Sequence, residues 1–430
     1  MKRTPRKALP ATLAVLALGL TAACGGGSSD SKATSATGPI KVWLSNNPEE
    51  IAWGKAMVAD WNSAHPKEKV TAQEIPAGKS SEEVIGAAIT AGNAPCLVFN
   101  TSPAAVPQFQ KQGGLVALDD FPGAKGYLEQ RSGDSAQQYQ SPDGKYYQIP
   151  WKQNPVMVFY NKDLFKKAGL DADNPQLSTY DDFLAASKKI VDSKAAPSAI
   201  APSPSSEFFQ SWFDFYPLYA AQSGGKQTIE DGKATFDDQA GKDVWSFWAQ
   251  MYQNDYAPKE AYDGDAFADK KAAMAIVGPW AVAVYKDKVN WGVVPVPTKD
   301  GMDPSQVNTF TDAKNIGLYA ACKNQKTAWN VLKFATSKEQ DGKLLEKTGQ
   351  MPIRTDLATD YADYFSKNPD YKTFADQASR TVEVPNVPNS VEIWQEIRDN
   401  YSKSVIFGKT SVDEGLKAAA SKADELAGQS

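Results

Sequence analysis

The side chains able to carry chemistry are unevenly divided among residue types in this sequence. It holds 11 Trp, 17 Tyr and 18 Phe, but three Cys and one His. Sulfur and imidazole groups are too sparse for a zinc site, and no metal or other cofactor is expected. The GxSxG and HExxH motifs of hydrolases and metalloproteases are absent. The 51 acidic residues could supply the paired carboxylates of a glycosidase, although no pair stands out.

The aromatic side chains suit a different chemistry, the binding of a sugar. A pyranose has apolar C–H faces and a rim of hydroxyl groups, so its site needs flat aromatic rings and planar amides or carboxylates. Trp280 follows a Gly-Pro turn, and Trp212 and Trp394 lie beside turn residues or at the start of an expected helix. Because an unselected tryptophan more often fills a core, the position of each in the fold must decide its role.

The beginning of the chain has the layout of an export signal. Four positive charges within the first seven residues precede an apolar run over residues 8–20. We therefore expect residues 1–23 to be a signal peptide. The following residues, 24–38, are rich in Gly, Ser and Thr and predict a flexible tether.

The residues LTAAC at the end of this leader resemble a lipobox, which implies a lipid-modified Cys24 as the mature N-terminus. Thr21 stands where lipoboxes usually carry Leu, Val or Ile. Ordinary secretion, with cleavage after Ala22 or Ala23, is the alternative. We expect a lipid-anchored protein on the extracellular face of the cell membrane.

Charge and hydropathy exclude two further classes. The formal net charge is −5, and removing the four positive charges of the leader leaves −9. An acidic protein without basic clusters is a poor binder of nucleic acid. No later segment approaches the ~20 apolar residues of a spanning helix, so the membrane is reached by the lipid alone.

The order of secondary structure predicts an α/β fold. Strands are expected at 40–45, 70–75 and 94–99, alternating with a helix that begins at Asn47-Pro48 and another over 80–92. Ligands of such parallel sheets bind outside the carboxyl ends of the strands. The remaining chain predicts a strand over 290–297 and helices over 326–349, 391–401 and 412–427.

Length and proline placement predict two lobes. The 407 residues from Cys24 onward exceed the size of one usual core. An extended segment over 146–165, which contains Pro150 and Pro155, is expected to cross from one lobe to the other.

Several motifs together resemble the maltose-binding-protein family, the larger class of extracellular solute-binding proteins that serve ABC importers. They include AGNAPCLVFNTS, FYNKDLF, the GPW turn and VEVPNVPNSVEIW, in the family's order. The resemblance implies an α/β, two-lobed periplasmic-binding-protein fold of type II with a multi-segment hinge. The implied bounds are 39–153 and 316–350 for the first lobe, 154–310 and 354–430 for the second, and 311–315 and 351–353 for hinge crossovers.

The resemblance also implies a ligand cleft between the lobes. Asn154 stands where maltose binders carry an acid, and a charged pair is absent around 100–104, so maltose itself is not implied. The implied ligand-binding residues are Asn46, Asn47, Asn100, Thr101, Trp151, Gln153, Asn154, Phe208, Phe209, Trp212, Trp280, Asp312, Lys314 and Trp394.

The two remaining cysteines form an even number in an oxidising compartment, which allows one disulfide. The family layout returns the chain to the first lobe after Asp312, which implies that Cys96 and Cys322 are neighbours. Two buried free thiols are the alternative.

The function implied by the resemblance is capture of a di- or short oligosaccharide by a monomer that delivers it to the permease subunits of an ABC transporter, without catalysis. The same fold could instead bind a peptide, a polyamine or a metal ion, and a secreted glycosidase is the alternative from another class.

Overall fold

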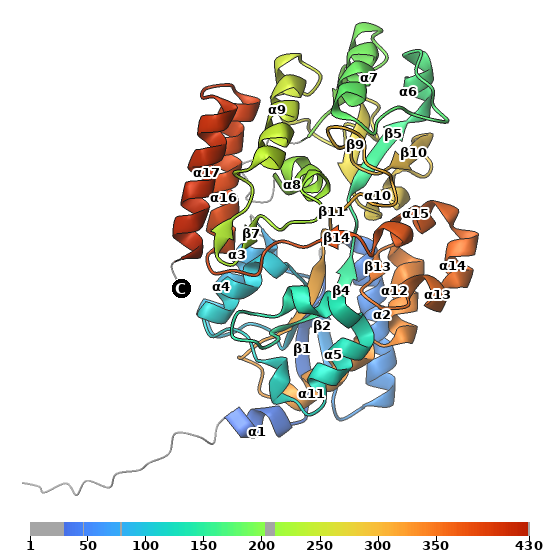
Figure 1. The fold of residues 1–430 in the computed structure, drawn as a ribbon. Coiled ribbons are helices and arrows are strands. Elements are labelled where there is room, and N and C mark those ends of the chain that lie inside the picture. The colour runs from blue at the N-terminus through green and yellow to red at the C-terminus, as the bar shows by residue number, and fades with distance from the viewer. Residues whose placement is uncertain (1–29, 46, 78–79, 203–210, 429–430) are drawn as a thin grey trace, which may run out of the picture.

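The computed structural model describes residues 30–45, 47–77, 80–202 and 211–428. Two α/β lobes lie one above the other in Figure 1, joined in the middle by segments that cross between them. This arrangement of two separate main sheets confirms the predicted fold class. Within the described ranges, no helix has the length and apolar character needed to cross a membrane.

The lower lobe is built on a six-stranded sheet in the order β13-β4-β12-β3-β1-β2. β1 lies parallel to β2 and β3, whereas β12 runs antiparallel between β3 and β4. The three β-rich runs predicted near the start of the chain are therefore strands, and a later segment returns to complete the sheet. The bounds are β1 Ile40–Trp43, β2 Val70–Gln73, β3 Leu97–Thr101, β4 Gln148–Gln153, β12 Lys314–Leu318 and β13 Met351–Pro352.

Helices flank this sheet, and the first of them begins where its capping residues predict. The side chain of Asn47 accepts hydrogen bonds from the backbone N–H groups of Glu49 (3.0 Å) and Glu50 (3.1 Å), and proline fills the first helical position. The bounds are α2 Pro48–Ala64, α3 Ser81–Thr90, α4 Val106–Lys111, α5 Ala124–Ser132, α11 Gln325–Ala335 and α12 Lys338–Thr348, with 3₁₀ turns at Pro103–Ala105, Leu118–Asp120 and Gly133–Tyr139.

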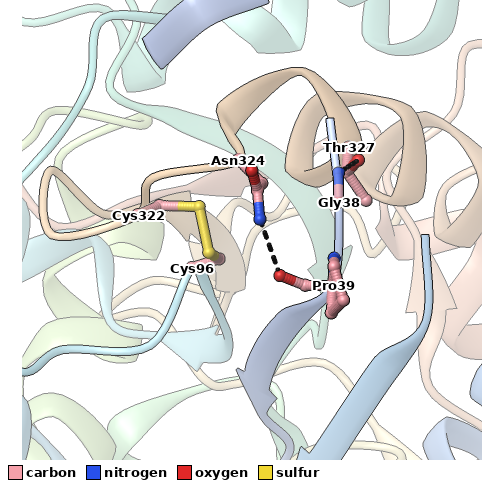
Figure 2. Close-up of a disulfide and its surroundings, with 6 residues drawn as sticks. All are labelled: Gly38, Pro39, Cys96, Cys322, Asn324 and Thr327. Atoms are coloured by element: carbon pink, nitrogen blue, oxygen red, sulfur yellow. Dashed lines mark hydrogen bonds between the residues drawn. A yellow bond between two sulfur atoms is a disulfide. The ribbon is translucent and has the colours of Figure 1, made fainter. Parts of the chain in front are cut away.

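A disulfide joins Cys96, directly before β3, to Cys322, four residues after the end of β12, with 4.5 Å between the Cα atoms (Figure 2). The pairing implied by the family layout is thus present. Beside it, the backbone N–H of Gly38 donates to Thr327 Oγ1 (3.1 Å), and Asn324 Nδ2 donates to the carbonyl of Pro39 (2.9 Å). The N-terminal end of α11 (Gln325–Ala335) and its capping residue Asn324 therefore hold the segment that leads into β1.

Part of the segment expected to be a flexible tether has regular structure. Asp30–Ser35 forms helix α1, which contacts α11. The backbone N–H of Lys326 donates to the carbonyl of Ala36 (3.1 Å), which ties the end of this segment to the lobe. The described end of the expected tether is thus held against the lobe by these contacts, and the bounds of the tether stay a prediction.

The upper lobe is built on a four-stranded sheet in the order β10-β5-β9-β6. Its strands are β5 Met157–Asn161, β6 Ser198–Ile200, β9 Ala272–Val277 and β10 Trp291–Val294, with a hairpin of β7 Ile229–Glu230 and β8 Lys233–Ala234. Its helices are α6 Lys162–Lys167, α7 Tyr180–Asp192, α8 Ser211–Gln222, α9 Gln239–Gln253, α10 Trp280–Tyr285, α16 Ser390–Tyr401 and α17 Val412–Ala427, with a π-helical turn at Ser402–Ile406.

The two lobes are connected by short extended segments. β4 of the lower sheet leads within four residues into β5 of the upper sheet, as the segment over 146–165 predicted. Beside it, β11 (Thr309–Phe310) pairs in parallel with β14 (Thr381–Val382), and Pro155 bridges to Thr311. These segments meet at the centre of Figure 1.

Three short helices lie beside the junction, α13 Leu357–Asp360, α14 Ala362–Lys367 and α15 Pro369–Gln377. Their buried side chains share one apolar cluster with Phe159 and Tyr285 of the upper lobe and with Leu345 and Met351 of the lower. The residue bounds given above for the lobes and hinge crossovers stay predictions.

Candidate ligand-binding site

The junction between the lobes is lined by a network of amide and hydroxyl groups. The backbone N–H of Asn154 donates to Thr311 Oγ1 (3.0 Å), and its Nδ2 donates to the carbonyl of Asp312 (3.0 Å) and to Gln350 Oε1 (3.3 Å). Asn154 is 1% exposed, so these bonds form away from water. These bonds connect the segments that contain Asn154, Thr311–Asp312 and Gln350. We call this group of polar residues the floor of the junction.

Two lysines at this floor are each paired with an acid. The buried ammonium of Lys152 contacts Glu50 Oε1, which also accepts a hydrogen bond from Gln350 Nε2. Burial raises the pKa of Glu50, but the charge of Lys152 and the hydrogen bonds from Lys152, Ser45 and Gln350 together outweigh it, so the net shift is downward. Lys314 Nζ lies 2.9 Å from Asp312 Oδ1, with side chains 20% and 18% exposed. Of these groups, Asp312 and Lys314 are the ones that a solute could reach.

A buried carboxyl group stands beside that reachable pair. Glu383 accepts hydrogen bonds from the backbone N–H of Val384 (2.7 Å) and from the hydroxyl of Tyr139 (3.2 Å). Burial is the main reason that its pKa rises to about 8, with Asp312 raising it further and the Val384 bond and Lys314 opposing. The carboxyl is therefore largely protonated at neutral pH.

The upper lobe contributes a connected group of aromatic rings. Phe213 packs edge-to-face on Trp280 (centroids 6.1 Å apart) and on Phe310 (6.0 Å), and Tyr216 contacts both Phe310 and Trp394 at 5.2 Å. Trp280 and Phe213 are half-buried, whereas the other three rings are enclosed. Phe310 links these rings to the polar junction, because it is two residues before Asp312 in the segment that crosses between the lobes.

Two tryptophans predicted as sugar platforms are core residues. Trp151 is 0% exposed and packs on Trp53 and Phe99, each at 5.4 Å. Trp394 is 1% exposed behind Tyr216. A ring enclosed on both faces cannot stack on a sugar, so we correct both assignments to core packing.

Three polar residues of the predicted set are also buried. Thr101 Oγ1 donates to the carbonyl of Val98 (3.1 Å) and shares a hydrogen bond with Tyr319 Oη (3.2 Å). Gln153 Oε1 accepts a bond from Thr381 Oγ1 (3.4 Å), and Asn154 holds the crossover described above. In this structure these side chains bind other protein groups, and their role in ligand binding stays a prediction.

Asn100 is a different case, because it lies half-buried at a bulge that ends β3. The pairing of β3 with β12 shifts register between Val98 and Thr101, and Asn100 has a left-handed backbone with φ of 71°. Bulges re-aim side chains near functional sites, and asparagine tolerates this conformation better than most residues. Asn100, Asn47, Trp280, Asp312 and Lys314 are the predicted residues that stay accessible.

The remaining predicted site residues are not among those that the structure describes. Asn46, Phe208, Phe209 and Cys24 lie outside the described residues, as does the side chain of Trp212. Sequence reasoning missed Phe213 and Glu383 as members of this region. The aromatic run SWFDFY was a signal for Phe213, whereas Glu383 had none, since its neighbours come from distant segments.

The fold and this junction define a two-lobed solute-binding protein. The family model for bacterial extracellular solute-binding proteins matches residues 45–342, and the chain belongs to that family. Membership of a family of binding proteins confirms the expectation of a non-catalytic role.

Individual relatives agree with this assignment. The chain is 25% identical to the maltodextrin-binding protein MdxE of Bacillus subtilis over 348 residues, 77% of this chain and 76% of that protein. It is 27% identical to the diacetylchitobiose-binding protein DasA of Streptomyces coelicolor over 357 residues, 78% and 79% of the two chains.

Solved structures share the fold. The cyclic α-maltosyl-1,6-maltose-binding protein of Arthrobacter globiformis superposes with a TM-score of 0.77 at 20% identity, over 92% of this chain and 100% of its own. The GacH receptor of Streptomyces glaucescens gives 0.76 at 24% identity, over 91% and 99%.

Proposed function

We propose that this protein captures a di- or short oligosaccharide between its lobes and delivers it to the permease subunits of an ABC transporter. The observation that carries the proposal is the half-buried pair Trp280 and Phe213, which packs on Phe310, two residues before the partly exposed Asp312–Lys314 pair. Aromatic rings can cover the C–H face of a pyranose while the polar groups bind its hydroxyls.

The charges of the junction support a neutral ligand. Lys152 is neutralised by Glu50 and Lys314 by Asp312, and the raised pKa of Glu383 keeps its carboxyl largely uncharged. An acidic or cationic solute would have to displace one of these partners, at the cost of leaving a buried charge unpaired. A sugar needs no such exchange.

We further propose that the protein acts as a monomer, anchored to the outer face of the cell membrane by a lipid on Cys24. The charged start, the apolar run and the sequence LTAAC support this anchor. Binding and release would occur as the two lobes move about the connection from β4 to β5 and about the predicted hinge crossovers at 311–315 and 351–353.

A thermal-shift panel tests the class of ligand. Maltotriose, diacetylchitobiose, a tripeptide, spermidine and ferric citrate are each added to the mature protein. A ligand at a hundredfold excess over its Kd stabilises the folded state by about 2.7 kcal/mol, which raises Tm by several degrees. We expect a rise with a sugar; a rise confined to the peptide, polyamine or iron would overturn the proposal.

A further inference from the structure

The ring of Trp280 lies directly on the backbone of Gly278, two residues before it. A methyl carbon on the Cα of Gly278 would stand 2.0 Å from Cζ3 and 2.6 Å from Cε3 and Cη2 of the indole. Carbon atoms in contact are about 3.5–4.0 Å apart. Any side chain at position 278 would therefore push the six-membered ring outward by about 1.5 Å.

The requirement for glycine at this position comes from the ring and not from the backbone. Gly278 is not among the residues with positive φ, so its backbone conformation is open to alanine. It is buried, and the next residue, Pro279, has φ of −64° fixed by its own ring. The backbone between Gly278 and Trp280 thus has little freedom to absorb a displaced indole.

The other side of the indole is bounded as well. Phe213 meets Trp280 nearly at a right angle, 84° between ring planes, and Phe213 is itself backed by Phe310. The residues that follow Trp280, Ala281 and Val282, are buried in α10. The indole of Trp280 is therefore held between the backbone of Gly278 on one side and the ring of Phe213, which is backed by Phe310, on the other.

We propose that Gly278 is a positioning residue that sets the height and tilt of the Trp280 ring, and so determines which sugar face fits against it. This inference rests on the proposed function. Stacking depends steeply on separation, because a gap of 0.5–1 Å already forfeits a quarter to a half of a dispersion contact. An indole displaced outward would leave less room for a sugar ring that now stacks on it. It would also no longer match the position of a sugar ring that fits against the present ring plane.

The test uses Gly278→Ala, Trp280→Ala and the double variant in the full mature chain. Gly126→Ala is the matched control, because Gly126 lies in α5 with no atom within 4 Å of an added methyl group. Calorimetric titrations use maltotriose and diacetylchitobiose. We expect Gly278→Ala to weaken binding of the bound sugar about tenfold, which is ~1.4 kcal/mol, and Gly126→Ala to leave it unchanged.

The double variant separates positioning of the ring from general damage. If Gly278 acts through Trp280, the double variant binds as weakly as Trp280→Ala alone; an additive loss would overturn the inference. Near-UV circular dichroism supplies a readout without ligand. Gly278→Ala must change the tryptophan signal that Trp280→Ala removes, and an unchanged spectrum would also overturn it.

The outcomes distinguish this inference from the proposed function. A sugar bound equally well by Trp280→Ala would remove Trp280 from the proposed site, and the inference with it. Binding that is weakened by Trp280→Ala but not by Gly278→Ala would refute the positioning role alone.

Discussion

Replacement of Glu383 by glutamine should change how the stability of the protein depends on pH. Glu383 is bound to both lobes: its backbone N–H donates to Gln138 Oε1 (3.2 Å), and its carbonyl accepts bonds from the hydroxyl of Tyr216 (2.6 Å) and Nε2 of Gln227 (3.0 Å). Its carboxyl group faces Tyr139, Asp312 and Lys314. Glutamine keeps the shape of this side chain but cannot ionise.

The magnitude follows from the pKa of Glu383, about 8 in the folded protein against an ordinary value of 4.5. Below pH 4.5 both states are protonated, and the carboxyl contributes no pH dependence. Between pH 4.5 and 8 the unfolded chain releases the proton that the folded protein keeps, so stability falls as pH rises, by about 1.4 kcal/mol per unit. Above pH 8 the loss is complete.

The expected difference between Glu383→Gln and the parent protein therefore grows by roughly 2–3 kcal/mol from pH 5 to pH 7. Urea denaturation at pH 5, 6, 7 and 8 measures it, with the exposed Glu392→Gln on α16 as control. The variant should gain stability relative to the parent protein as pH rises. A difference that stays constant across this range would show that Glu383 ionises normally, and the reasoning about its burial would be refuted.

Three other predictions concern the anchor, the disulfide and a core ring. Cys24→Ala should abolish labelling by radioactive palmitate, and undiminished labelling would exclude the lipid site. Removing the bridge with Cys96→Ala and Cys322→Ala together should lower the free energy of unfolding by about 2–4 kcal/mol in urea; unchanged stability would contradict this. Trp394→Ala should cost about 3–5 kcal/mol of stability, whereas a loss of sugar affinity at unchanged stability would return Trp394 to the site.

Local sequence signals were sufficient for the elements that depend on neighbouring residues. The Asn47-Pro48 start of α2 could be predicted because a capping side chain and a first-turn proline act within one turn. The crossover from β4 to β5 could be predicted because prolines bracket an extended run of β-forming residues.

The orientation of the large side chains could not be predicted in the same way. Trp151 is enclosed by Trp53 and Phe99, and Trp394 by Tyr216, residues about 50 to 180 positions away in the chain. Such distant partners determine whether a tryptophan is buried. The residues next to it in the sequence therefore do not predict its burial.

The same reason explains why Glu383 was not singled out among the acids. Its environment is made by Tyr139 and by the Asp312–Lys314 pair, which belong to two segments far from Glu383 in the sequence. A perturbed carboxyl becomes visible once the tertiary structure has brought its neighbours together.

The most direct test of the central claim is a calorimetric titration of the mature protein with maltotriose and with diacetylchitobiose. We predict saturable binding of one of them with one sugar per chain. Saturable one-to-one binding of the tripeptide, spermidine or ferric citrate, with no heat from either sugar, would contradict the assignment of this protein as a sugar-binding subunit.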